Sequence, residues 1–246
     1  LKPRFIHHPR TRSLLKEVLV ALELDLEATY LDVPRLRMVT SHGYLTSGVG
    51  YAHHPHRDTW YSAPLQQLNW WLPIWEMDAS SAVAFHPSHW DVPVRNSSEE
   101  FDYYEWNAVG RAQAAKHVTS DTRKQPKPLE VPALEPHVRP VVPPGGVVLF
   151  SAAQLHSTVP NTTGRTRYSI DFRTVHLPDV EAGIGAPNVD SAPRGTSLRD
   201  FRRASDDAAP PEVLARRLDG RAQPQGVVVY RPADGGAAPG VQKRAG

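Results

Sequence analysis

Hydrophobic and polar positions repeat with two different periods along the chain, and each period predicts one kind of element. Residues 11–30 place leucine and valine at intervals of three and four, with lysine and glutamate between them, which predicts an amphipathic helix. Residues 165–175 alternate instead, with arginine, serine and aspartate on one face and Tyr168, Ile170 and Phe172 on the other. This alternation is the clearest strand prediction in the sequence.

Other segments have the composition of strands. Residues 35–51 are β-like and interrupted by three glycines, and residues 65–75 and 81–86 are rich in aromatic and branched side chains. We interpret the last two as buried strands of an antiparallel sheet. In residues 141–150, Pro-Pro-Gly-Gly comes before Val-Val-Leu-Phe, which predicts a turn leading into a further strand.

Two long segments differ from this strand-rich pattern. Residues 96–137 begin with a predicted helix over 98–117 and continue as a charged stretch with prolines, so we interpret them as an insertion or lid over the sheet. Residues 178–246 are rich in alanine, proline, glycine and arginine and form a C-terminal extension. Within it, the pattern predicts one helix over 212–218 and a short strand over 227–230.

Length and composition predict one domain over residues 1–246, because 24 prolines suit short strands and ordered loops better than long helices. A net charge of +2 is too small for a concentrated basic face, so we expect no nucleic-acid partner. No apolar run reaches the roughly 18 to 20 residues that span a bilayer, and the first residues lack the apolar core of a secretory signal. We therefore expect a cytoplasmic protein with no membrane partner.

Metal chemistry is restricted to histidine and carboxylate ligands, because the chain has no cysteine. The tripeptide His56-Arg57-Asp58 offers one of each, and alternation along a strand would place His56 and Asp58 on one side and Arg57 on the other. Two histidines and one carboxylate form the facial triad that holds Fe(II) and leaves coordination positions open. The tripeptide alone is common by chance, so a metal site needs a third ligand from elsewhere in the fold.

His156 is the candidate for that third ligand, because it follows the buried strand that ends at Phe150. Arg167 comes eleven positions later, on a neighbouring strand across a turn, and Ser169 shares its face. A guanidinium pairs bidentately with a carboxylate, so Arg167 and Ser169 suit the distal carboxylate of 2-oxoglutarate. Simpler interpretations remain open: a structural role for His156 in a polar loop, and a cross-strand ion pair between Arg167 and Asp171 or another acid.

In combination, these motifs resemble the phytanoyl-CoA dioxygenase-like branch of the Fe(II)/2-oxoglutarate oxygenases over residues 40–175. The matching elements are His56-x-Asp58, Phe85-His86-Pro87-Ser88-His89, Gly-Val-Val-Leu-Phe before His156, and Arg167-x-Ser169. The family's Pro-Gly-Ser-His turn appears here without its glycine. The resemblance implies a mainly β fold, a double-stranded β-helix (a cupin-like jelly roll) with flanking helices and a helical insertion at 96–137.

The resemblance also implies a set of ligands. Fe(II) would be held by His56, Asp58 and His156, with 2-oxoglutarate and O2 as co-substrates and a small molecule as the substrate. In this family the position two after the distal histidine, here Thr158, often contacts 2-oxoglutarate, and a residue among Asn69, Trp70 and Trp71 often lines the same pocket. Halogenating relatives replace the triad carboxylate with a small residue, so Asp58 favours hydroxylation or a related oxidation that begins by hydrogen abstraction from a C–H bond. A role in tailoring natural products is a further expectation by analogy.

Two other hypotheses remain at this stage. A cupin-type isomerase, or a dioxygenase that does not use 2-oxoglutarate, would bind its metal through three imidazoles, those of His54, His56 and His156. A non-catalytic jelly-roll module would instead contact a sugar through the aromatic side chains of residues 66–75, and its histidines would be incidental. The sequence carries no signal for the oligomeric state.

Overall fold

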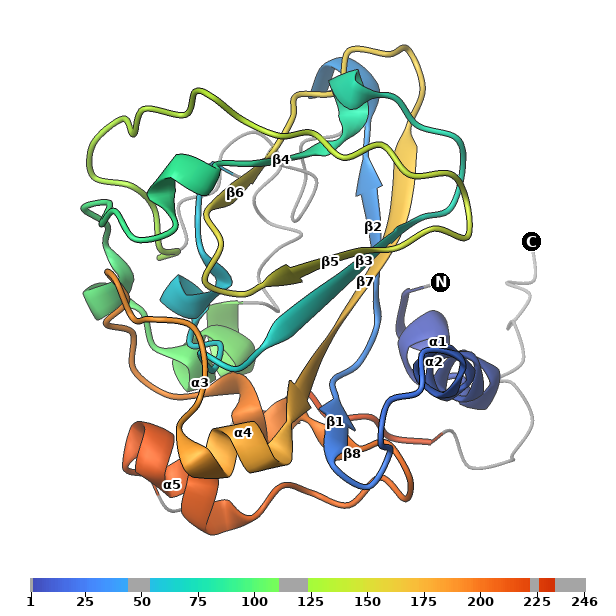
Figure 1. The fold of residues 1–246 in the computed structure, drawn as a ribbon, viewed down its shortest axis with the longest axis vertical. Coiled ribbons are helices and arrows are strands. Elements are labelled where there is room, and N and C mark those ends of the chain that lie inside the picture. The colour runs from blue at the N-terminus through green and yellow to red at the C-terminus, as the bar shows by residue number, and fades with distance from the viewer. Residues whose placement is uncertain (1, 44–53, 111–123, 222–225, 233–246) are drawn as a thin grey trace, which may run out of the picture.

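The computed structural model describes residues 2–43, 54–110, 124–221 and 226–232. They form two antiparallel sheets with flanking helices (Figure 1). The larger sheet has the strand order β5-β3-β7-β1-β8, and β2 also pairs with β7; the smaller sheet contains β4 and β6. The strands are β1 (Thr29–Leu31), β2 (Arg35–Val39), β3 (Leu68–Pro73), β4 (Val83–Phe85), β5 (Val148–Ser151), β6 (His156–Thr158), β7 (Arg167–His176) and β8 (Arg202–Arg203).

Short helices connect and cover these strands. The α-helices are α1 (Lys2–Ile6), α2 (Pro9–Ala21), α3 (Tyr103–Glu105), α4 (Leu177–Ala182) and α5 (Glu212–Asp219). Single 3-10 turns are η1 (Ser41–Gly43), η3 (Asp58–Tyr61), η4 (Ala79–Ser81), η5 (Pro87–His89), η6 (Ser98–Glu100) and η9 (Ser197–Asp200), and η7 (Trp106–Gly110) is a π turn. No helix among the described residues is long and apolar enough to cross a membrane.

Strand β7 is the centre of the larger sheet, because it pairs with β1, β2 and β3. Its predicted alternation is confirmed. Phe172 stacks on Trp70 of β3 with ring centroids 5.2 Å apart, in a core cluster that includes Leu15 of α2. On the opposite face, Arg167 donates a hydrogen bond to the carbonyl of Ser81, just before β4. The apolar face of β7 therefore builds the core under α2, and its polar face lies toward the smaller sheet.

The first predicted helix is shorter than its hydrophobic pattern. Helix α2 ends at Ala21, and Glu23 adopts a positive φ of 59°, a left-handed conformation that stops an α-helix. Tyr30 and Leu31 instead form β1, where they pair with β7 and β8 and are buried. The helix prediction was wrong over residues 22–30, because tertiary pairing outweighs local periodicity there.

The two strands predicted over 65–75 and 81–86 exist as β3 and β4, but they lie in different sheets. Strand β3 pairs with β5 and β7, whereas β4 pairs with β6. The prediction that they belong to one sheet was therefore wrong. Strand β2 confirms the first part of the strand predicted over 35–51; residues 44–51 of that prediction lie outside the described residues.

The insertion does not open with one long helix. The helix predicted over 98–117 is divided into η6, α3 and η7, and residues 111–117 lie outside the described residues. Asp102 accepts hydrogen bonds from the backbone N–H groups of Tyr104 and Glu105, so the chain starts a new helical turn at that point. The capping side chain of Asp102 thus interrupts the helix that the sequence pattern predicts as continuous.

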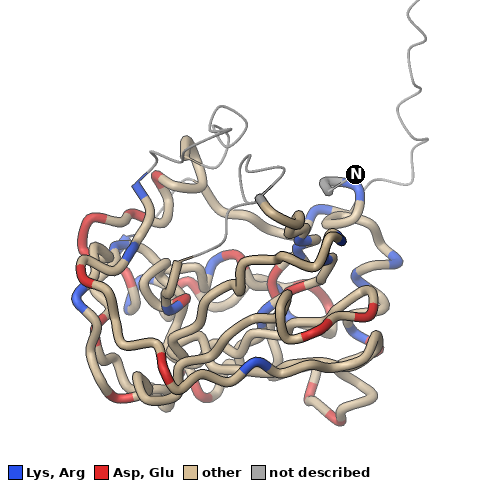
Figure 2. Tube along the Cα trace, turned by 90° about the horizontal axis from the view of Figure 1, so that it is seen from above, with Lys and Arg blue, Asp and Glu red and all other residues tan. Residues whose placement is uncertain are grey.

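The C-terminal segment packs onto the edge of the larger sheet. Val180 of α4 and Leu214 of α5 share a core cluster with Tyr30 of β1 and Val175 of β7. The helix predicted over 212–218 is confirmed as α5. The strand predicted over 227–230 is wrong, because the N–H of Val228 donates to the carboxylate of Asp200 and not to a neighbouring strand. In Figure 2, basic and acidic positions are mixed along the described chain.

Candidate metal centre

Two histidines that are far apart in the sequence meet through their main chains. His56 and His156 form an isolated antiparallel bridge, in which each backbone N–H donates to the carbonyl of the other at 2.9 and 3.0 Å. Residues opposite each other in such a pair direct their side chains to the same side. The two imidazole centroids accordingly lie 4.3 Å apart, and both residues are buried.

Asp58 completes a group of three potential ligands. Its Oδ1 lies 3.6 Å from Nε2 of His56 and 4.0 Å from Nε2 of His156, and the three ligand atoms lie within 4.8 Å of one another. Ligands at about 2.1 Å from one ion and at right angles would be about 3 Å apart. The donor set and its spacing therefore fit a divalent ion after small side-chain shifts. Among the described residues, this is the one group of three or more potential ligands.

The sequence analysis identified the candidate ligands His56 and Asp58, but assigned the wrong backbone conformation to Asp58. Asp58 is the first residue of the 3-10 turn η3, not part of a strand, and Arg57 before it is extended. Arg57 does point away from the triad, as alternation predicted. Its guanidinium is buried and donates to Asp190 at 3.0 Å and to the carbonyls of Ala153 and His89 at 2.5 Å. These bonds fix the tripeptide to the loop that leads to His156.

The tautomers of both histidines suit metal binding. Nδ1 of His56 lies 2.8 Å from the carbonyl of His54, and Nδ1 of His156 lies 2.9 Å from the carbonyl of Gln154. A carbonyl oxygen only accepts, so each Nδ1 carries the hydrogen and each Nε2 carries the lone pair. In both residues it is this Nε2 that faces Asp58.

The charges of these groups also suit ligands at neutral pH. Burial, followed by the neighbouring imidazole of His56, lowers the pKa of His156 to about 4. Burial raises the pKa of Asp58, but the adjacent imidazoles of His56 and His156 and the charge of Arg173 lower it by more, so it lies well below its usual range. His156 is therefore neutral and Asp58 ionised, which are the states that bind a metal cation.

Asn69 and Gln67 form a chain of amides behind Asp58. The amide nitrogen of Asn69 donates to Oδ2 of Asp58 at 2.9 Å, and Nε2 of Gln67 donates to the amide oxygen of Asn69 at 2.8 Å. The sequence singled out Asn69 for the co-substrate pocket, and the structure brings its amide to Asp58. The sequence analysis did not single out Gln67, although alternation along the chain places Gln67 on the same face as Asn69.

Arg167 and Ser169 lie on the polar face of β7 with unsatisfied groups. Nη1 of Arg167 donates to the carbonyl of Ser81, and its guanidinium carbon lies 5.3 Å from the ring centroid of Trp71. Nε of Arg167 and Oγ of Ser169 are buried with no hydrogen-bond partner among the described residues. Burial lowers the pKa of Arg167 to about 10, which still leaves it charged at neutral pH. A buried cation beside an unsatisfied hydroxyl is suited to an anionic ligand.

The alternative prediction, an ion pair between Arg167 and Asp171, is wrong. Asp171 pairs with Arg37 of β2, with Nε and Oδ1 2.6 Å apart, and Arg167 forms no ion pair with a carboxylate of the described residues. The pairing of β2 with β7 places Arg37 opposite Ser169, which sequence analysis could not detect because it depends on which strands are neighbours.

The remaining candidates differ in their orientation. Thr158 lies two positions after His156 on β6, so it shares that face of the strand. On β3, Trp71 faces Arg167, whereas Trp70 lies on the other face, in the core with Phe172. His54, the third imidazole of the alternative metal site, directs Nε2 to the carbonyl of Pro126 at 2.8 Å. It therefore lies outside the group of three ligands.

The polar face of the larger sheet carries more positive than negative side chains around the triad. Arg173 pairs with Asp32 at 3.0 Å, and Asp32 also pairs with Arg35 at 2.5 Å. Four arginines and three aspartates are placed here, a surplus of one positive charge: Arg35, Arg37, Arg167, Arg173, Asp32, Asp58 and Asp171. A divalent ion would raise that surplus further, so this face favours a ligand with more than one negative charge.

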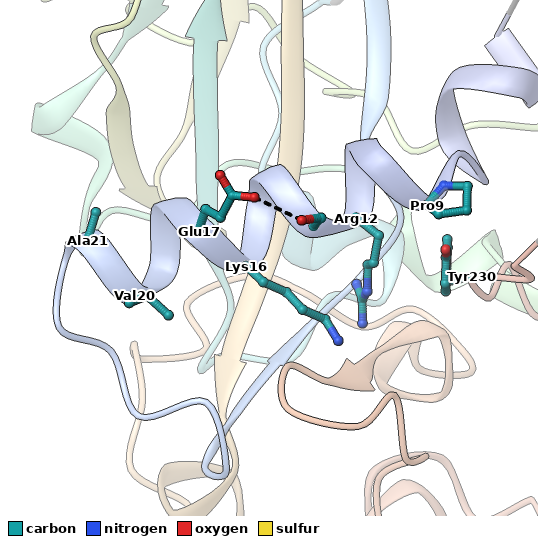
Figure 3. Close-up of a pocket in the computed structure, with 8 residues that line it drawn as sticks. Pro9, Arg12, Lys16, Glu17, Val20, Ala21 and Tyr230 are labelled. Atoms are coloured by element: carbon teal, nitrogen blue, oxygen red, sulfur yellow. Dashed lines mark hydrogen bonds between the residues drawn. The ribbon is translucent and has the colours of Figure 1, made fainter.

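A pocket of about 520 Å³ lies elsewhere, along α2 (Figure 3). Its lining includes Lys16, Arg12, which pairs with Asp207 at 2.9 Å, and Tyr230, whose ring centroid lies 5.2 Å from the Arg12 guanidinium carbon. Because α2 packs on the apolar face of the larger sheet, this pocket is separate from the candidate ligands, and none of them lines it.

Comparisons with known proteins give distant similarity only. No family profile and no curated protein matches the chain. Among solved structures it is similar to EvdO2 from Micromonospora carbonacea var. aurantiaca, solved with and without 2-oxoglutarate, at 14% identity over 71% of this chain and 62% of that one, with a TM-score of 0.43.

The epimerase SnoN, solved with Fe3+, alpha ketoglutarate and nogalamycin RO, is 17% identical over 70% of this chain and 57% of that one, with a TM-score of 0.40. The non-heme monooxygenase ThoJ is 13% identical over 71% and 54%, with a TM-score of 0.39. This chain spans less than two thirds of each of these three proteins. Because all three TM-scores lie under 0.5, the function of this chain has to be inferred from the geometry of its own site.

Proposed function

We propose that this chain is an Fe(II)/2-oxoglutarate-dependent oxygenase of the phytanoyl-CoA dioxygenase-like family, built on a double-stranded β-helix. His56, Asp58 and His156 would hold the iron. The observation that carries the proposal is their convergence, with both Nε2 atoms facing Oδ1 of Asp58, beside a sheet face on which Arg167 has no carboxylate partner among the described residues.

The co-substrate assignment rests on charge and on unsatisfied groups. 2-Oxoglutarate is a dianion, and the sheet face beside the triad carries surplus positive charge. Arg167 would pair with its distal carboxylate, and the hydroxyl of Ser169 would donate a further hydrogen bond. Trp71, whose ring lies against the guanidinium of Arg167, would hold that guanidinium in place and keep water from it. Thr158 would contact the same ligand from β6.

Iron, when bound together with 2-oxoglutarate and O2, supplies the oxidation of a substrate C–H bond while 2-oxoglutarate is converted to succinate and carbon dioxide. The chain's own part is to orient the ligands and to exclude water from the reaction. Because Asp58 keeps its carboxylate in the triad, hydroxylation of a small molecule is favoured over halogenation. Substrates of natural-product biosynthesis are the class that we would test first.

The turnover of 2-oxoglutarate tests this proposal. We expect the iron-loaded protein to form succinate in an O2-dependent reaction, and a screen of small molecules to find substrates that accelerate it. Asp58→Ala should form no succinate above the background of free iron. Product formation that required iron and O2 but not 2-oxoglutarate would favour the cupin-type alternative, and iron-independent binding of a sugar without turnover would favour the binding module.

A further inference from the structure

The two oxygens of the Asp58 carboxylate have different surroundings. Oδ1 faces both imidazoles, at 3.6 and 4.0 Å from their Nε2 atoms. Oδ2 accepts a hydrogen bond from the amide nitrogen of Asn69 at 2.9 Å. One oxygen thus faces the ligand group while the other is held by the protein.

Both ends of the Asn69 amide are used. Its oxygen accepts from Nε2 of Gln67 at 2.8 Å, which fixes which end of the amide faces Asp58. Asn69 is 4% exposed and Gln67 is 3% exposed, so water does not replace either partner readily. The order Gln67, Asn69, Asp58 therefore sets a single direction of donation toward Oδ2.

The backbone joins this chain of amides to the rest of the site. The N–H of Ala152 donates to the carbonyl of Gln67 at 3.0 Å, and Ala152 precedes His156 in the loop after β5. Asn69 itself lies in β3, and this strand pairs with β5 on one side and with β7 on the other. The donor to Asp58 is thus carried by a central strand of the sheet and not by a loop.

From this geometry we infer that Asn69, oriented by Gln67, is a positioning residue that makes Asp58 a one-oxygen metal ligand. A carboxylate that rotated to bind the metal through both oxygens would give up the hydrogen bond from Asn69 and leave a buried amide donor unsatisfied. The coordination position that a second oxygen would occupy thereby stays available. This inference rests on the proposed function, because it presumes that the triad binds a metal.

Binding of Co2+ to the protein under anaerobic conditions, followed by its visible absorption, tests the inference without turnover. We expect Asn69→Ala to bind Co2+ about 10- to 100-fold more weakly than the parent, the range typical for lost partners of metal ligands. Its absorption spectrum should also change, because Oδ2 becomes free to bind. Gln67→Met, which keeps the size but removes the donor to Asn69, should produce a smaller change in the same direction.

Asn161→Ala is the matched control. Asn161 is as buried as Asn69, but its amide nitrogen donates to the carbonyls of Val39 and Arg165, so its loss should alter neither the affinity nor the spectrum. If the parent binds Co2+ and both Asn69→Ala and Gln67→Met match it in affinity and spectrum, the positioning role is overturned while the metal site stands. If the folded parent binds no divalent ion, the proposed function fails, and this inference fails with it.

Discussion

Arg167 shows at the scale of one residue how the site differs from an ordinary sheet surface. It is 9% exposed and charged, and Asp171, the acid four positions further along β7, pairs with Arg37 instead. A buried cation without a carboxylate partner costs stability, and a protein keeps such a group where a ligand neutralises it.

Replacing Arg167 should therefore weaken the binding of 2-oxoglutarate specifically. Loss of a charge-assisted pair of about 1.5 to 3 kcal/mol should raise the concentration of 2-oxoglutarate needed for half-maximal succinate formation in Arg167→Ala. Arg167→Lys should lie between, because an ammonium lacks the planar fork. Arg165→Ala removes an exposed arginine of the same segment and should leave the concentration unchanged. Equal requirements in Arg167→Ala and the parent would remove Arg167 from the co-substrate site.

At the scale of elements, Asp190 ties three segments together behind the metal motif. Its carboxylate accepts from Nε of Arg57 at 3.0 Å, from Nε1 of Trp60 at 2.7 Å and from the N–H of Val94 at 2.9 Å. It comes from the C-terminal segment, which was not connected with the site in the sequence. This residue thus couples the C-terminal segment to the tripeptide that carries two of the ligands.

Asp190→Ala should be strongly destabilising, because it leaves the buried Arg57 guanidinium without its counter-charge. The expected loss in the free energy of unfolding is about 3 to 5 kcal/mol. Asp206→Ala breaks an exposed pair with Arg203 and should leave the free energy of unfolding nearly unchanged. Denaturant unfolding of the two variants compares them directly. Similar midpoints would mean that the Arg57–Asp190 pair contributes little to the fold.

Elements were predictable from sequence where one local pattern decides them, and unpredictable where distant pairing does. The alternation of β7 and the helical spacing of α5 were both sufficient to predict those elements. The first helix was wrongly predicted over residues 22–30, because Tyr30 and Leu31 are buried in strand pairing that no local pattern reveals. The neighbours of β4 were misassigned for the same reason.

In the candidate site, too, some residues were identifiable from the sequence, and others depend on contacts between distant segments. His56, Asp58 and His156 were identifiable because their residue types restrict the chemistry, and the structure brings them together. The pairing of Asp171 with Arg37 required knowing that β2 lies beside β7. Gln67 carries no chemical signal of its own, and its importance appears only through its bond to Asn69.

At the scale of the whole molecule, a buried carboxylic acid makes stability depend on pH. Asp200 is 1% exposed and accepts hydrogen bonds from Tyr103 and from the N–H of Val228. Burial raises its pKa from 3.8 to about 6, although these hydrogen bonds lower it in part. Between these two values the folded state holds a proton that the unfolded state has lost, so this group's contribution to stability falls as pH rises.

Asp200→Asn should remove that dependence. The parent should lose up to about 3 kcal/mol of unfolding free energy relative to Asp200→Asn as pH rises from about 4 to about 7. Asparagine keeps an acceptor for the N–H of Val228, so the comparison isolates the charge. Chemical unfolding at a series of pH values gives both curves. Parallel curves would show that Asp200 has the same pKa in the folded and unfolded states.

The central claim is that one site binds Fe(II) and 2-oxoglutarate together, and anaerobic absorption spectroscopy tests it most directly. Chelation of the iron by the keto acid produces a weak visible metal-to-ligand charge-transfer band. We predict that this band appears when both Fe(II) and 2-oxoglutarate are added to the parent, is absent with either one alone, and is lost in His156→Ala. An iron-loaded parent that shows no such band at saturating 2-oxoglutarate would contradict the claim.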